Sequence, residues 1–166
     1  MRQLLCMSIA AIMVCGCGKG VLYPQLEPNS GNFSDPASKV GDKPKDPWTL
    51  TTHQSAVKGF TPNSGEVVTL VGEVIDLSCY LQLGKHGKSH RDCAQKCMRN
   101  GQPIALLTKE GAIYLLMEEE HDPRRDSKTN LRAKCIELAA DIVEVTGTLA
   151  KINGYNGLFV HGFLEK

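Results

Sequence analysis

The sequence predicts a mainly β fold: a five-stranded barrel with one helix before the fourth strand. Two observations predict it. Segments rich in β-branched residues begin at Glu66 and recur to the end of the chain, which is typical of strands. Only Lys128–Ala140 among the later segments places its apolar residues at helical spacing. A further short helix, which carries Cys and His residues, is expected as an insertion after the first strand.

The first three strands are expected between Val67 and Met117. Val67–Leu77 is a β-branched run with Gly72 in its interior, which favours a long strand with a bend or bulge. Pro103–Thr108 and Ala112–Met117 are apolar runs separated by three residues that end in glycine. This spacing predicts a hairpin.

The helix and the last two strands follow. Lys128–Ala140 has apolar residues at positions 131, 135 and 138, so one face of a helix would be apolar. Asp141–Lys151 alternates as a strand, and the Asn-Gly dipeptides at 153–154 and 156–157 are turn signals. Leu158–Leu164 completes the set as the fifth strand.

This order of elements resembles the OB-fold. Val143–Leu149 followed by Gly157–Val160 is similar to the last two strands of small bacterial OB-fold domains, and the resemblance spans residues 65–166. The resemblance implies the fold but says nothing about the function. Several OB domains bind oligonucleotides, but the net charge of +1 and the aromatic content of 5% give no basic, aromatic-rich face. We therefore expect no nucleic-acid partner.

The N-terminus predicts export. Residues 1–16 have a positive start, a short apolar run and small residues at their end, as in a signal peptide. The apolar run is shorter than the roughly 20 residues that a transmembrane helix needs. The residues before Cys17 resemble the lipobox of bacterial lipoproteins, which implies that Cys17 carries the lipid. Cys15 is a weaker alternative lipidation site. The simpler alternative to a lipoprotein is a secreted protein with an ordinary cleaved signal peptide.

Residues 17–64 are rich in Pro, Gly, Asn, Ser and Lys, so we expect a flexible tether between the lipid and the domain at 65–166. Trp48, with Leu50 and Phe60, is where the chain would begin to dock on that domain. Gly18 is not the aspartate that retains many lipoproteins at the inner membrane. The expected location is the cell envelope, on the periplasmic face of the outer membrane if the cell is Gram-negative.

Seven cysteines are present, and three of them precede the domain. The four in the domain are Cys79, Cys93, Cys97 and Cys135. An even number of cysteines outside the cytoplasm is the usual setting for disulfides, and four cysteines allow three pairings.

The segment around Cys93 predicts a metal site. A helix over His90–Arg99, with Ser89 as its N-cap, would place His90, Cys93 and Cys97 on one face. The glycine-containing loop before it could bring Cys79 over that face. Three cysteines and a histidine suit a closed zinc site, and thiolates with an imidazole also suit Cu⁺. Helical Cys-x₃-Cys near a His resembles the copper site of periplasmic copper-delivery proteins, in those few residues alone.

Two other interpretations stay open. The cysteines of the domain could form disulfides that only stabilise a structural or protein-interaction module, with Cys135 as one partner. A strained Cys93–Cys97 bridge would instead make a thiol–disulfide redox protein. Asp76 is a candidate second-shell partner, and His86 and Cys135 are candidate alternative ligands. No catalytic motif is present, so the favoured function is binding of a metal or of an envelope protein, on a membrane surface reached through the lipid.

Overall fold

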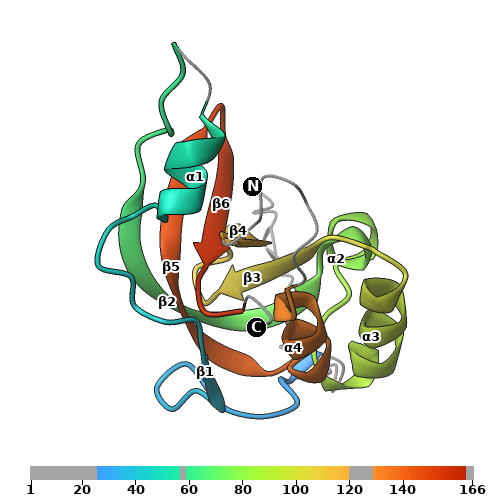
Figure 1. Ribbon diagram of the computed structural model, residues 1–166. Helices are drawn as coiled ribbons and strands as arrows, with labels where there is room; N and C mark the ends of the chain where they lie inside the picture. Colours follow the sequence, from blue (N-terminus) through green and yellow to red (C-terminus); the bar gives the residue numbers. More distant parts are fainter. Residues whose placement is uncertain (1–25, 57–58, 120–128, 164–166) are drawn as a thin grey trace, which may run out of the picture.

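Five strands close a mixed β-barrel in the part of the chain that the computed structural model describes, which is residues 26–56, 59–119 and 129–163 (Figure 1). The barrel order is β5-β2-β3-β4-β6, and β6 pairs back to β5. β4 and β6 are parallel, and the other barrel pairs are antiparallel. The strands are β2 Glu66–Asp76, β3 Ile104–Thr108, β4 Ile113–Glu118, β5 Ile142–Ile152 and β6 Tyr155–Val160. The predicted OB-like barrel is confirmed.

Strand β2 changes its pairing partner around Gly72, in the interior of the long strand that the sequence predicts. Its first part pairs with β5 and its last part with β3, and Gly72 and Glu73 pair with both. A Cβ atom on Gly72 would lie 2.7 Å from the Leu106 side chain and from the Leu107 carbonyl oxygen, so this position has no room for a side chain. The glycine thus lets one strand turn from one neighbour to the next and close the barrel.

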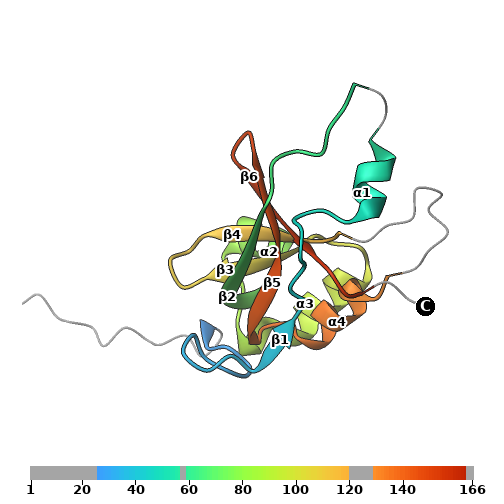
Figure 2. The same ribbon diagram turned by 60° about the vertical axis from the view of Figure 1, so that its left-hand side comes forward.

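Two of the four α-helices in the described part of the chain were predicted. Helix α4 precedes β5, and α3 lies in the insertion between β2 and β3 after a short 3₁₀ turn at Lys88–His90. Ser89 is not the N-cap of α3, because the chain enters α3 directly from that turn. The helices are α1 Leu50–Ser55, α2 Leu77–Leu83, α3 Arg91–Arg99 and α4 Leu131–Glu137. Figures 1 and 2 both show α3 and α4 side by side, with α1 apart from them. Over the described residues, no helix has the length and apolarity needed to cross a membrane.

The core fills the barrel and continues under α3 and α4. Met98 on α3 and Leu131 and Cys135 on α4 are buried against Leu106 and other barrel residues. The inner face of α3 is made by Ala94 and Met98, which lie one turn apart. Burial of this face fixes the rotation of α3 and therefore the direction in which its cysteines point.

The segment before β2 differs from the expected tether. Within it, β1 Ser38–Val40 pairs in parallel with Val143–Val145 of β5, and the side chain of Asn29 donates a 2.7 Å hydrogen bond to Asp141. The Trp48 ring packs edge-on against Phe159, with ring centroids 5.1 Å apart. The first part of β5 has β2 on one side only, so its other edge is available to β1. From Leu26 the chain therefore belongs to the folded domain, while Cys17 and the signal peptide lie outside the described residues.

Candidate metal centre

The last residue of β2 also starts the next helix. The Asp76 side chain caps α2, since its Oδ1 accepts a 3.0 Å hydrogen bond from the Ser78 N–H. Cys79 therefore lies in the first turn of α2. Gly84 ends the helix in the left-handed conformation, with a φ of 64°, and Gly87 has a φ of 79°. These two positions favour glycine and reverse the chain, so that α3 returns over the end of β2.

The reversal brings the four residues predicted as ligands together with Asp76. The potential donor atoms of Cys79, His90 and Cys93 lie within 4.8 Å of one another, and so do those of Asp76, Cys79 and Cys97. Cys79 belongs to both groups. Sulfurs bound to one zinc at about 2.3 Å are about 3.8 Å apart in a tetrahedron, so the spacing suits a bound ion. We refer to these five residues as the Cys/His/Asp cluster.

The cluster is closed at one end and open at the other. Asp76 is 1% exposed and His90 is 7% exposed, whereas Cys93 lies at the surface. His90 Nε2 is buried and has no hydrogen-bond partner. Asp76 Oδ2 is buried without a conventional hydrogen bond and faces the thiols of Cys79 and Cys97. Buried polar atoms of this kind usually have partners, so each is a position where a ligand fits.

Charge in the cluster is unbalanced. A hydrogen bond to the Asp76 carboxylate, together with burial, raises the pKa of the Cys79 thiol to about 12. Burial and then the same carboxylate raise the pKa of Cys97. Burial lowers the pKa of His90, against the opposing effect of Asp76. Without a cation these shifts favour the protonated thiols of Cys79 and Cys97 and the neutral form of His90, and a metal ion would reverse this preference at the thiols.

His86 lies outside the cluster. Its Nδ1 is 2.7 Å from Oε2 of Glu73. The other carboxylate oxygen of Glu73, Oε1, accepts a 2.6 Å hydrogen bond from the Gly87 N–H. Glu73 is 4% exposed, and burial raises its pKa although His86 opposes the shift. The sequence analysis did not identify Glu73 as a functional residue. The only feature that marks it in the sequence is the presence of a carboxylate within a β-branched run.

Cys135 is also remote from the cluster. It is 1% exposed in the core beneath α4, and burial raises its pKa to about 12. All four cysteines of the described residues are free thiols in the structure. The bridge from Cys135 that the stapling interpretation needs is therefore not formed, because α4 directs this thiol into the apolar core.

A second residue that sequence reasoning missed holds α3 in place. The Arg91 guanidinium donates to the carbonyl oxygens of Glu137 and Ala139 and, at 3.1 Å, to the Asp141 carboxylate. It thereby joins the start of α3 to the end of α4 and the start of β5. Nothing in the sequence around Arg91 marks this role, because all three partners come from about 50 residues later.

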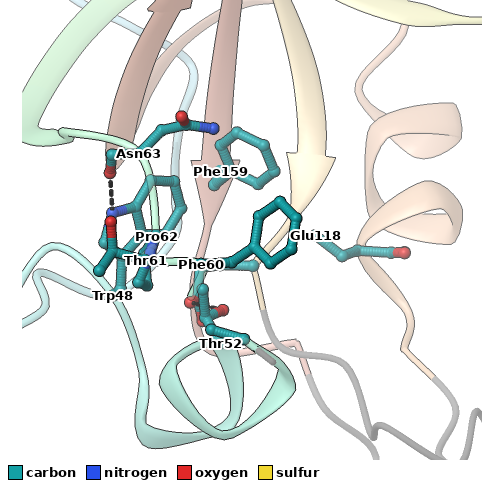
Figure 3. A pocket seen from close by; sticks show the side chains of 10 residues that line it. Trp48, Thr52, Phe60, Thr61, Pro62, Asn63, Glu118 and Phe159 are labelled. Atoms are coloured by element: carbon teal, nitrogen blue, oxygen red, sulfur yellow. Dashed lines mark hydrogen bonds between the residues drawn. The ribbon is translucent and has the colours of Figure 1, made fainter. Parts of the chain in front are cut away.

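A separate hollow of about 300 Å³ lies between α1 and the barrel (Figure 3). The rings of Trp48, Phe60 and Phe159 gather around it, and the Glu118 side chain points away from them. The buried carboxylate beside it, Glu119, accepts hydrogen bonds from the backbone and side chain of Thr49 and from Thr52. The hollow is thus mainly apolar, and its carboxylate is engaged in holding α1 on the barrel.

No protein-family model, curated protein or solved structure matches this chain. The fold assignment therefore stands on strand topology, and the candidate function stands on the chemistry of the cluster.

Proposed function

We propose that this protein is a lipid-anchored protein of the cell envelope that binds one transition metal ion, Zn²⁺ or Cu⁺. The ligands are Cys79, His90, Cys93 and Cys97, and Asp76 supplies a further negative charge. The observation that carries the proposal is the buried Asp76 carboxylate, which lies against the free thiols of Cys79 and Cys97, while Cys79 also lies in a donor group with His90 and Cys93.

The argument rests on the free energy of a buried charge. A carboxylate removed from water is strongly unfavourable unless an opposite charge or full hydrogen bonding compensates for it. Among the described residues no lysine or arginine forms an ion pair with Asp76, whereas Asp141 has Arg91. A cation among the sulfurs would place a positive charge beside the carboxylate and would convert the thiols to thiolates, whose negative charges oppose part of that gain.

The donor set limits the identity of the ion. Thiolates with an imidazole suit Zn²⁺ in tetrahedral geometry and Cu⁺, while Mg²⁺ and Ca²⁺ require oxygen ligands. Lipidation at Cys17 would place the cluster near a membrane surface, and the open end at Cys93 would be available to an envelope protein partner.

A thiol–disulfide role is the second candidate. The sulfurs of Cys79 and Cys97 lie within 4.8 Å of each other, so a modest shift could join them. The direction of their pKa values opposes a redox function, because reactive cysteines have a lowered pKa and these have a raised one. A Cys79–Cys97 bridge would then serve stability alone.

Elemental analysis with thiol counting tests the proposal. The full-length protein is extracted from the envelope and compared with His90→Ala and with the control His53→Ala, which removes an exposed histidine of α1. One equivalent of Zn or Cu in the wild type and the control, with cluster thiols that react only after chelation, supports the proposal. Loss of the ion in His90→Ala assigns the ligand. A metal-free wild type whose Cys79 and Cys97 are joined in a mapped disulfide contradicts the proposal and leaves these two cysteines as a structural bridge.

A further inference from the structure

A second hollow, of about 200 Å³, opens beside the Cys/His/Asp cluster. His86, His90 and Lys85 contribute to its wall, together with the residues around Gly84. His90 is therefore shared: it faces this hollow, and it also belongs to a donor group with Cys79 and Cys93. The hollow gives an ion from solvent access to His90, which is the member of the cluster that lines it.

His86 is held in a definite orientation at this hollow. Its Nδ1 lies 2.7 Å from the Glu73 carboxylate, and its ring packs edge-on against Tyr80 with centroids 5.7 Å apart. The Glu73 side chain is 5% exposed and is fixed in turn by the Gly87 N–H. With Nδ1 engaged, Nε2 is the ring nitrogen that remains for a ligand. Metal-binding histidines characteristically donate their other N–H to a carboxylate, which fixes the ring and raises its basicity.

We propose that His86 is an entrance ligand at which a Zn²⁺ or Cu⁺ ion first binds through Nε2, before it moves past His90 to the cysteines. This inference rests on the proposed function. The transfer is a ligand exchange: the bond to His86 breaks as bonds to the cluster form, and each cysteine that binds releases its proton to solvent. Lys85, at the edge of the hollow, is exposed, so solvent screens its charge.

A purely structural role for His86 would be to neutralise Glu73. His86→Asn separates the two roles, because the asparagine amide can still donate to Glu73 from the position of Nδ1, but nothing replaces Nε2. Glu73→Gln keeps the volume and removes the carboxylate that orients the ring. His53→Asn, on α1, is the matched control because this histidine is exposed and belongs to neither site.

The test measures the rates of binding and release in the full-length chain. Co²⁺ serves as the spectroscopic substitute for Zn²⁺: its uptake is followed by stopped-flow absorbance of the sulfur–cobalt bands, and its release by mixing with a chelator. His86→Asn and Glu73→Gln should reach the wild-type spectrum and stoichiometry, with uptake and release both slowed by about tenfold, the lower end of the usual effect of such orienting groups. His53→Asn should match the wild type.

Three results would overturn the inference in distinguishable ways. Wild-type rates in His86→Asn would leave His86 as a structural partner of Glu73. A changed final spectrum or a lost equivalent of Co²⁺ would make His86 a ligand of the cluster itself. A wild-type protein that develops no sulfur–cobalt bands and takes up no Cu⁺ under reducing conditions would refute the proposed metal site before any variant is compared.

Discussion

Asp76→Asn is the substitution that most directly tests why a carboxylate is buried beside the thiols. An asparagine retains the shape of the side chain and can accept the hydrogen bond from the Ser78 N–H, so α2 keeps its cap. What it removes is the negative charge that faces Cys79 and Cys97. The metal-free protein should lose no more than about 1 kcal/mol of stability, since removing an unneutralised buried charge offsets the lost contacts.

Coulomb's law gives two opposing contributions to the metal affinity. The Asp76 oxygen lies within 4.8 Å of the two sulfurs, so at an effective dielectric constant of 20 each thiolate that binding creates would cost roughly 3 kcal/mol. A Zn²⁺ ion at a similar separation would gain about as much as the two thiolates cost. Asp76→Asn should therefore change the Zn²⁺ affinity by less than about tenfold, and it should lower the pKa values of Cys79 and Cys97, which the carboxylate raises.

The assay combines thermal unfolding of the chelated protein with competition between the protein and a chelator for Zn²⁺. Asp92→Asn is the matched control, because Asp92 lies on α3 next to Cys93 but is exposed. The reasoning is refuted if the thiols of Asp76→Asn react with the same pH dependence as those of the wild type while its metal-free form unfolds several degrees lower. That pair of results would make Asp76 a helix cap and nothing more.

Three further outcomes follow from the same contacts. Because the pKa values of Cys79 and Cys97 are raised, to about 12 for Cys79, both thiols must lose a proton when they bind the ion. Chelator competition between pH 6.5 and 7.5 should therefore show that the Zn²⁺ affinity rises about tenfold per pH unit for each of the two thiols. An affinity that does not change with pH would exclude these cysteines as ligands. Cys135→Ala should keep one equivalent of metal, and the cavity left by the lost thiol should lower the unfolding free energy by about 1 kcal/mol. Loss of the ion in elemental analysis would contradict the position of this thiol in the core. Arg91→Lys should lower the unfolding free energy in urea by about 1–3 kcal/mol, because one ammonium cannot reach all three oxygens; unchanged stability would show that Arg91 does not anchor α3.

The barrel was predictable because its signals are local. β-Branched runs, the hairpin spacing and the Asn153-Gly154 turn each occupy fewer than a dozen consecutive residues. The turn predicted at 156–157 is wrong, because these two residues pair with β5 within β6. The pairing of Ser38–Val40 with β5 carries no such signal. It depends on a free strand edge that only the assembled barrel creates, more than 100 residues further along the chain, and its three residues are too few for a pattern.

The cluster was predictable in composition and only partly in geometry. The spacing of His90, Cys93 and Cys97 places them on one helical face from the sequence alone. The position of Cys79 near these three residues depends on α2, a seven-residue helix that the sequence does not predict. The Asp76 carboxylate could be predicted only as a neighbour, because its burial is a property of the closed barrel.

Strand β2 buries two carboxylates within four residues, and their surroundings differ. The buried negative charge of Glu73 has two partners, the His86 ring and the Gly87 N–H. Asp76 has the N–H of Ser78 on one oxygen and only thiols facing the other. A thiol is a weak hydrogen-bond donor, so two thiols compensate for a buried negative charge far less than an imidazole does. The same loop provides a full partner for the carboxylate three residues earlier. The deficit at Asp76 is therefore the feature that most supports the proposed metal ion, which the sulfurs would hold beside this carboxylate.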